Sequence, residues 1–166
     1  SGKSKGQFYT PSEVSRVIAQ ILGIRQAKTS NDTTVYDPAC GSGSLLLKIG
    51  DEARHGGKDV LVSLFGQEKD SSTAGLARMN MILHNYATAE IKQGNTLASP
   101  LFTEGSALKT FDYVVANPPF SDKRWSTGLL TDSDPFERFT GYGVPPAKQG
   151  DYAYLLHIIR SLKSTG

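Results

Sequence analysis

Two consecutive prolines, Pro118 and Pro119, determine where one strand of this chain must end. They follow Asn117 and the apolar run 113–116, and Phe120 follows them. Proline donates no backbone hydrogen bond and its ring fixes φ, so a strand that reaches Asn117 must stop and turn there rigidly. Ligands of open α/β sheets bind at the carboxyl ends of strands. We therefore expect this tetrapeptide to line a binding site.

The tetrapeptide suits methylation of a planar exocyclic amine. The lone pair of such an amine is delocalised into its ring, so the amine is a poor nucleophile. The side-chain oxygen of Asn117 and the carbonyl of Pro118 can each accept one N–H, which localises the lone pair on nitrogen, while Phe120 stacks on the flat base. The alternative interpretation is a rigid strand-to-loop turn with a phenylalanine in the core.

A glycine-containing loop lies between a predicted strand and a predicted helix. Residues 33–36 are β-branched or aromatic, residues 37–44 read Asp-Pro-Ala-Cys-Gly-Ser-Gly-Ser, and an apolar run follows. Gly41 and Gly43 let the backbone approach a ligand and turn into the helix. Leu46 stands where a dinucleotide-binding fingerprint has its third glycine, which disfavours a nicotinamide or flavin site.

Three polar residues follow the predicted strands at their carboxyl ends. Asp37 can anchor an amino group directly or through water, or it can simply cap the turn. Glu68 lies 25 residues beyond Gly43, the arrangement that hydrogen-bonds ribose hydroxyls, although an isolated strand-end glutamate is usually solvated. Asn95 can bond the edge of an adenine ring, but asparagine after glycine is first of all a turn residue.

Besides the helix after the glycine loop, three helices are expected around these strands. Residues 10–13, Thr-Pro-Ser-Glu, read as a capping box with Thr10 as the N-cap, followed by an apolar stripe to Leu22. The start of this helix can seat a ligand carboxylate, or the same residues can serve capping alone. The second helix, from residue 71 or 72 to about residue 86, is expected to be largely buried. The third is an amphipathic helix over residues 151–163.

Composition limits the classes of function. A length of 166 residues with 38% hydrophobic content predicts one domain. The net charge of +2 is nearly neutral. If this chain acts on nucleic acid, much of the binding is therefore expected to come from outside this chain. The single cysteine, Cys40, excludes an intramolecular disulfide and suits a reducing cytoplasm. No apolar run reaches the length that spans a bilayer, no membrane association is expected, and no metal site is predicted.

Residues 121–149 show no helical or strand period and are rich in glycine, proline, aspartate and lysine. A long irregular segment in a compact domain is usually a lid, a binding loop or disordered. Because this segment directly follows Phe120, we expect it to face DNA or a partner subunit.

Taken in order, the segments resemble the modification (methyltransferase) subunit of type I restriction-modification systems, within the DNA N6-adenine methyltransferases. The motifs that carry the resemblance are Gly-Gln-Phe-Tyr-Thr-Pro, Asp-Pro-Ala-Cys-Gly-Ser-Gly, Phe-Gly-Gln-Glu, Met-Asn-Met, Gly-Asn-Thr-Leu and Asn-Pro-Pro-Phe. The resemblance implies a Rossmann-like α/β fold that binds S-adenosylmethionine. It also implies a truncated form, a partial catalytic domain over residues 1–166, because the full subunit has a helical region before these motifs and further strands after them.

The resemblance also implies roles for individual residues. The first two motifs would hold the methionine part of the cofactor, Glu68 its ribose and Asn95 its adenine, although an acid is often found at the position of Asn95. Asn117, Pro118, Pro119 and Phe120 would bind the flipped adenine, with Asn117 also beside the cofactor. The expected cofactor-binding residues are thus Gln7, Tyr9, Thr10, Asp37, Pro38, Gly41, Gly43, Glu68, Asn95 and Asn117.

The predicted function is transfer of a methyl group from S-adenosylmethionine to the N6 amine of adenine in DNA, within a complex that contains specificity and restriction subunits. The isolated chain is expected to be inactive. Alternatives are methylation of RNA or of a protein glutamine, or a non-catalytic cofactor-binding or assembly module.

The right-handed crossover rule and the family's order place the four expected strands as 3-2-1-4, with residues 111–116 at an edge. This apolar edge is expected either to self-associate or to be buried under residues 121–149.

Overall fold

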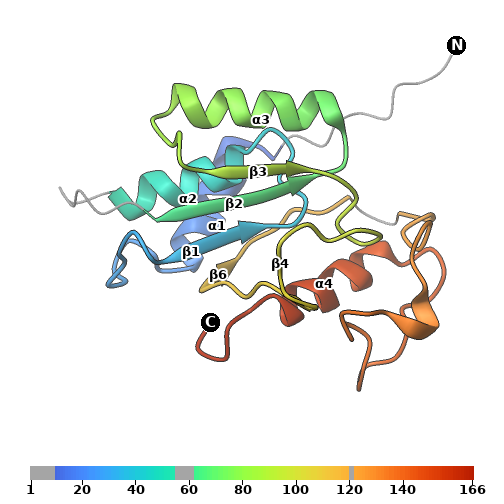
Figure 1. Ribbon diagram of the computed structural model, residues 1–166. Helices are drawn as coiled ribbons and strands as arrows, with labels where there is room; N and C mark the ends of the chain where they lie inside the picture. Colours follow the sequence, from blue (N-terminus) through green and yellow to red (C-terminus); the bar gives the residue numbers. More distant parts are fainter. Residues whose placement is uncertain (1–9, 55–61, 120–121) are drawn as a thin grey trace, which may run out of the picture.

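The computed structural model describes residues 10–54, 62–119 and 122–166 (Figure 1). The predicted site residues Gln7, Tyr9 and Phe120 lie outside these ranges. The elements, in chain order, are α1 (Ser12–Ile21), β1 (Thr34–Asp37), α2 (Ser44–Arg54), β2 (Ser63–Glu68), α3 (Ser71–Leu83), β3 (Glu90–Gln93), β4 (Thr103–Glu104), β5 (Ala107–Leu108), β6 (Tyr113–Val114), a short 3₁₀ helix η1 (Thr131–Ser133) and α4 (Gly150–Arg160).

The main sheet has four parallel strands in the order β3-β2-β1-β6. This order confirms the expected 3-2-1-4 arrangement. The fourth expected strand corresponds to β6, which precedes the two prolines in the chain. The antiparallel hairpin of β4 and β5 was not expected, because its two-residue strands leave no period that a sequence pattern can detect. All four arrows of the main sheet point the same way in Figure 1, so their carboxyl ends meet at one edge.

Side chains alternate between the two faces of the sheet. Val35 and Leu64 face a core cluster that includes residues of α1, α2 and α3, whereas their neighbours Tyr36 and Phe65 belong to an aromatic cluster on the opposite face. In that aromatic cluster Tyr36 stacks on Phe111 with ring centroids 4.5 Å apart. Because both faces are covered, the strands are apolar on both sides, as is usual for parallel sheets.

The start of α1 differs from the expected capping box. The N-cap is Pro11 and no side chain caps the helix, while Thr10 lies one residue earlier and is buried. The fully buried residues of α1 are Ser15 and Ala19, whose small side chains let the helix pack on α2. The apolar stripe of the sequence is therefore wider than the buried contact, and Val14, Val17 and Ile21 remain exposed.

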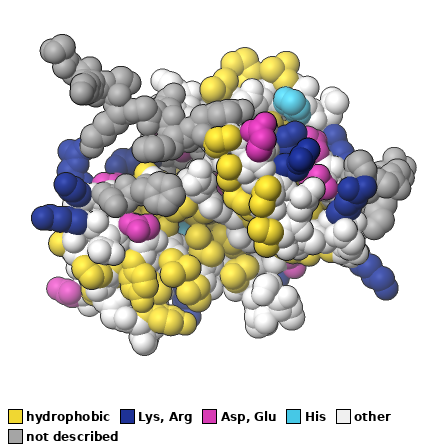
Figure 2. Space-filling model, turned by 180° about the vertical axis from the view of Figure 1, so that it is seen from behind, with side chains coloured by type: hydrophobic (Ala, Val, Ile, Leu, Met, Phe, Trp, Pro, Cys, Tyr) yellow, Lys and Arg dark blue, Asp and Glu magenta, His cyan; other side chains and the backbone are white. Residues whose placement is uncertain are grey.

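The expectation that α3 is largely buried is wrong. Ala74, Ala77 and Met81 are buried, but the helix covers the sheet with one side only. The large apolar residues of its outer side are exposed, and they are Leu76, Met79, Ile82 and Leu83. Figure 2 shows the molecule from behind, and hydrophobic side chains are gathered at several places on the face seen in this view.

Among the described residues, no helix is long and apolar enough to cross a membrane.

The edge beside β6 is partly covered, but not by the segment that was expected to cover it. Phe111 forms a parallel bridge with Leu162, which follows α4. The Phe111 N–H donates to the Ser161 carbonyl at 2.9 Å, and the Lys163 N–H donates to the Phe111 carbonyl at 3.0 Å. The Lys163 ammonium also contacts Asp112 at 2.9 Å. The residues after α4 thus begin the pairing of this edge, and self-association through it stays a prediction.

Gly66 in β2 explains how the glycine loop packs on the sheet. A Cβ built on Gly66 would lie 2.8 Å from the Cys40 sulfur and 2.9 Å from Cδ1 of Ile91. We predict that Gly66→Ala lowers the free energy of unfolding by about 1–3 kcal/mol, because the buried neighbours must move apart. Urea denaturation measures this loss.

The matched control is Gly75→Ala on the exposed side of α3, where an added Cβ meets no atom within 4 Å. This change should stabilise the chain by about 0.5–1 kcal/mol, because alanine favours a helix over glycine. Adding Cys40→Ala to Gly66→Ala should recover part of the lost stability. Equal stability of the Gly66→Ala variant and the unchanged chain would show that the contact with Cys40 is not tight.

Candidate active site

Four of the predicted site residues come together because they follow parallel strands. Asp37 is the last residue of β1, and Glu68 is the last residue of β2. Asn95 lies two residues after β3, and Asn117 lies three residues after β6. All four therefore lie at the carboxyl edge of the sheet, on the right in Figure 1, where ligands bind in folds of this type.

The glycine loop is held by carboxylates on both sides. The Ala39 N–H donates to Oδ1 of Asp37 at 2.9 Å, which closes a turn at the start of the loop. The Gly41 N–H donates to Oε2 of Glu68 at 3.0 Å. The other oxygen of Glu68 accepts from the Asp70 N–H at 2.8 Å, next to the start of α3. Glu68 is thus oriented by two backbone groups, and an ionised carboxylate has lone pairs left for ribose hydroxyls.

The two glycines of the loop serve different purposes. Both have positive φ, 55° for Gly41 and 81° for Gly43, a conformation that favours glycine. A Cβ on Gly41 would meet no atom within 4 Å, so this glycine leaves open space beside the loop. A Cβ on Gly43 would lie 2.6 Å from Cε of Met81 in α3. Gly41 is therefore suited to close approach by a ligand, whereas Gly43 allows the loop to pack on α3.

Asn95 uses its side-chain oxygen within its own turn. This oxygen accepts from the Leu97 N–H at 3.1 Å and from the Ala98 N–H at 3.4 Å. The amide NH₂ group is then the part of the side chain left to meet a ligand. That Asn95 bonds the adenine of the cofactor stays a prediction.

Asn117 contacts Thr10, which lies two residues before the start of α1. Its Nδ2 donates to the hydroxyl oxygen of Thr10 at 3.2 Å, although the two residues are 107 positions apart in the chain. Because the amide nitrogen is used in this way, Oδ1 of Asn117 faces away from Thr10, and it has no hydrogen-bond donor among the described residues. Thr10 thus belongs to the site through Asn117 and not as a helix cap.

The prolines at the site have trans peptide bonds. The rigid turn expected at Asn117 is not seen, because β6 already ends at Val114 and residues 115–119 are irregular. Pro118 and Pro119 are half-buried just after Asn117. Pro38 accepts a hydrogen bond at its carbonyl from the Thr96 hydroxyl at 2.6 Å, which ties the glycine loop to the turn after β3.

Burial determines the protonation of the site. Asp37 is 2% exposed, and its pKa is raised from 3.8 to about 7, mainly by burial and in part by the nearby Glu68 carboxylate, against the lowering effect of the Ala39 N–H. Burial also raises the pKa of the Cys40 thiol, so this cysteine stays a neutral thiol, as expected for a packing residue. The site thus contains a buried acid without a cationic partner among the described side chains that contact it.

The sequence did not reveal a buried polar network beside the site. Arg138, from the irregular segment 122–149, forms a bidentate ion pair with Asp134 at 2.8 and 2.9 Å, and both side chains are at most 3% exposed. Arg138 also contacts Nδ1 of His157 in α4 at 3.5 Å, and Nε2 of His157 contacts the Tyr36 hydroxyl at 3.2 Å. Burial, together with the Arg138 charge, lowers the His157 pKa to about 3, so this histidine is neutral.

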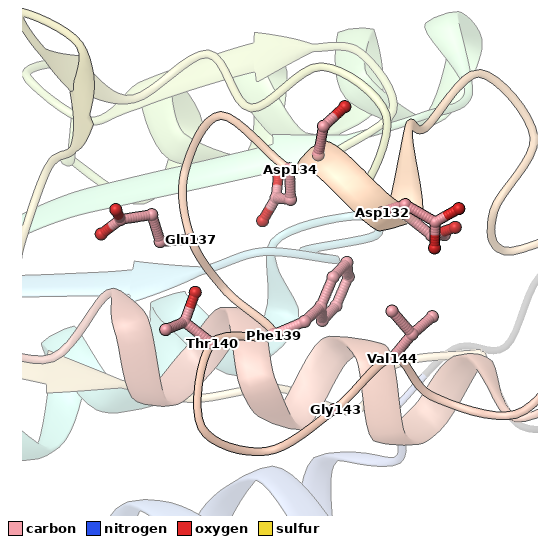
Figure 3. Close-up of a pocket in the computed structure, with 9 residues that line it drawn as sticks. Asp132, Asp134, Glu137, Phe139, Thr140, Gly143 and Val144 are labelled. Carbon is pink, nitrogen blue, oxygen red and sulfur yellow. The ribbon is translucent and has the colours of Figure 1, made fainter.

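A hollow of about 360 Å³ lies within the irregular segment. Figure 3 shows Asp132, Glu137, Phe139 and Val144 around it, in a loop that lies over a helix. Glu137 is engaged by Arg160 of α4 at 2.8 Å. None of the residues that line the hollow belongs to the predicted cofactor or target site, so the hollow is a feature of the segment's own packing.

Comparison with known proteins agrees with this arrangement of motifs. The sequence model of the N-6 DNA Methylase family matches residues 1–166. The chain belongs to this family. It is 39% identical over 182 residues to the type I restriction enzyme MpnII methylase subunit of Mycoplasma pneumoniae, an alignment that covers 100% of this chain and 31% of that protein. The chain therefore spans about a third of the length of this curated relative.

Solved structures show the same fold. The methyltransferase subunit of a type I restriction-modification system from Streptococcus thermophilus matches with a TM-score of 0.78 and 36% identity, over 100% of this chain and 34% of that one. An S-adenosylmethionine-dependent methyltransferase from Thiobacillus denitrificans, solved with S-adenosyl-L-homocysteine, matches with a TM-score of 0.53 and 13% identity over 98% of this chain and 49% of that one. The expected α/β methyltransferase fold is confirmed.

The buried carboxyl of Asp37 generates a pH prediction. Because the pKa of Asp37 is raised on folding, the folded chain binds more protons than the unfolded chain between about pH 4 and pH 7, and stability falls as pH rises through this window. Asp37→Asn keeps the acceptor for the Ala39 N–H and removes the charge. We predict that it is more stable than the unchanged chain at pH 8, by up to about 4 kcal/mol, and nearly equal at pH 4.

Urea denaturation of both proteins at the two pH values tests this. The opposite contribution of His157, which is lost as pH falls from 6.5 toward 3, cancels because both proteins contain it. A stability difference that does not change between pH 4 and pH 8 would show that Asp37 is ionised without cost in the folded chain.

Proposed function

We propose that this chain is the catalytic part of a protein that transfers a methyl group from S-adenosylmethionine to the N6 amine of adenine in DNA. The observation that carries the proposal is the orientation of Asn117. The Thr10 hydroxyl accepts a hydrogen bond from the amide nitrogen of Asn117. The side-chain oxygen of Asn117 is therefore oriented to accept an N–H of the target amine. Membership of the N-6 DNA Methylase family supports the proposal that the chain binds S-adenosylmethionine. The cluster of Asp37, Glu68 and Asn95 at the strand ends supports it as well.

The residues at the glycine loop fit this cofactor. Asp37 is a buried carboxyl that loses stability when ionised, and a ligand ammonium beside it would compensate the charge. The open space beside Gly41 admits a ligand close to the backbone, and Glu68 offers free lone pairs to ribose hydroxyls. Bound S-adenosylmethionine supplies a methyl group on a positively charged sulfur.

Asn117 and Pro118 act on the target amine. When the amine nitrogen bonds to the methyl carbon, the carbon–sulfur electron pair would leave with the cofactor's sulfur, and positive charge would develop on the nitrogen until one N–H proton is lost to solvent. The acceptors at Asn117 and Pro118 stabilise the N–H groups as this charge grows. The attack is direct, because the buried Cys40 thiol is held in the cofactor loop and is not a nucleophile toward the base.

The proposed setting is a cytoplasmic type I complex in which a specificity subunit supplies base recognition and a restriction subunit cuts unmodified DNA. The near-neutral net charge of +2 favours such a division, because a chain that grips DNA unaided usually carries a stronger basic surface. We propose that this chain alone does not methylate DNA. The competing substrates, RNA and a protein glutamine, are outcomes of the first experiment.

That experiment measures radioactive methyl incorporation by the full-length protein with its partner subunits, offered DNA, RNA or protein. Incorporation at N6 of adenine in DNA supports the proposal. Incorporation only into RNA or protein would reassign the substrate, and no incorporation together with normal cofactor binding would favour an assembly role.

Asn117→Ala tests the target side. We predict that this variant of the full-length protein keeps its affinity for S-adenosylmethionine and lowers the methylation rate by about 10²–10³, since a preorganised acceptor contributes about 3–4 kcal/mol in the transition state. Single-turnover kinetics measure the rate and calorimetry measures the affinity.

Thr10→Val is the companion variant. It removes the hydroxyl that orients Asn117 but leaves the Asn117 oxygen in place, so the rate should fall by a smaller factor. Loss of cofactor affinity in Asn117→Ala, with the rate at saturating cofactor unchanged, would show that Asn117 serves the cofactor instead of the target.

A further inference from the structure

Arg138 uses its guanidinium to join two parts of the chain that are far apart in sequence. Besides the ion pair with Asp134, its NH2 nitrogen donates to the Leu97 carbonyl at 2.9 Å, and its NH1 nitrogen lies 3.5 Å from the Thr96 carbonyl. The residue is 2% exposed. A buried arginine is costly unless its donors are satisfied, and here they bond a carboxylate, two backbone carbonyls and a histidine ring.

The two carbonyls belong to the turn that carries Asn95. Leu97 is held from both sides, because its N–H donates to Oδ1 of Asn95 at 3.1 Å and its carbonyl accepts from Arg138. This pair of bonds fixes which way the Asn95 amide points. With the oxygen directed into the turn, the NH₂ group is left for a ligand, and a ring nitrogen with a lone pair is the group that it recognises.

The other end of the link is the segment that follows the two prolines. Asp134 and Arg138 lie in residues 122–149, and Phe139 packs against Trp125 with ring centroids 6.0 Å apart. Phe139 and Trp125 share a core cluster with Leu97 and, at its margin, with Ala39 of the glycine loop. The segment is therefore packed directly against the cofactor side of the site.

We propose that Arg138 is a positioning residue that sets the adenine preference of the cofactor site, by holding the Asn95 turn against the segment that follows the target-binding turn. This inference rests on the proposed function, because it takes the ligand of Asn95 to be the adenine of the cofactor. It gives residues 122–149 a second role, since their packing fixes a group that recognises the cofactor.

A lysine cannot replace Arg138 in this role. The planar guanidinium reaches a carboxylate with two parallel bonds and still has donors directed at the carbonyls, whereas an ammonium is a point charge with three donors. Arg138→Lys keeps the positive charge beside Asp134 and loses the fixed fork. It therefore separates the positioning role from the charge.

The test compares two ligands that differ only at the base. S-adenosylhomocysteine has a lone pair on ring nitrogen N1, whereas S-(1-deazaadenosyl)homocysteine has a C–H there, which cannot accept a hydrogen bond from Asn95. The full-length protein should bind the adenosyl ligand about 5- to 100-fold more tightly in calorimetry. In Arg138→Lys this ratio should fall toward one, mainly through weaker binding of the adenosyl ligand.

Two further variants act as controls. Arg160→Met removes an arginine that pairs with Glu137 on the exposed side of the same segment, and it should leave the ratio unchanged. Asn95→Ala should lower the ratio by itself, and adding Arg138→Lys to it should lower the ratio no further. If Arg138→Lys does not fold, Asp134→Asn supplies the test, because it weakens the support of Arg138 and keeps the side-chain shape.

The outcomes are distinguishable. An unchanged ratio in a folded Arg138→Lys protein overturns the inference and leaves the proposed function intact. Equal weakening of both ligands would show that Arg138 is structural only, which also overturns the inference. If the unchanged full-length protein binds neither ligand, the proposed cofactor itself is wrong, and the inference falls with it.

Discussion

The site depends on one constraint, the common direction of the four strands of the main sheet. Parallel strands place their carboxyl ends at the same edge, so polar residues that follow different strands must meet there. Asp37, Glu68, Asn95 and Asn117 are brought together in this way, although they are spread over half the chain. The right-handed crossovers through α2 and α3 place helices on the sheet and leave the carboxyl edge free for loops.

Hydrogen bonds within the loops then orient the groups that the strands deliver. Glu68 holds the Gly41 N–H, Asn95 caps its own turn, and Thr10 accepts from Asn117. Each of these bonds fixes the orientation of one polar side chain at the carboxyl edge of the sheet. Arg138 is also fixed by hydrogen bonds, and all its donors are engaged inside the protein. It therefore acts through the residues it holds and not by contact with a ligand.

Periodic apolar runs, glycines and prolines are local signals, and they predicted the residues at the strand ends. The sheet order was predicted from the crossover rule and from the order in the family that the chain resembles. The sequence did not predict which partners the side-chain amides of Asn95 and Asn117 have within the protein, since these depend on loop geometry. The buried pair of Asp134 and Arg138 was also missed, because a charged residue in an irregular segment is usually solvated. The capping box at Thr10 was wrong by one residue, and the burial of α3 was overestimated because apolar content alone does not tell which side of a helix meets the sheet.

The bond between Thr10 and Asn117 also bears on the order in which the site forms during synthesis of the chain. The central strand β1 can pair with β2 early, but its other neighbour, β6, pairs over only two residues and leaves the ribosome some 80 residues later. Thr10 must wait for that strand before it has a partner. The pairing of β1 with β2 and the glycine loop between β1 and α2 can therefore form while the contact between Thr10 and Asn117 is still absent.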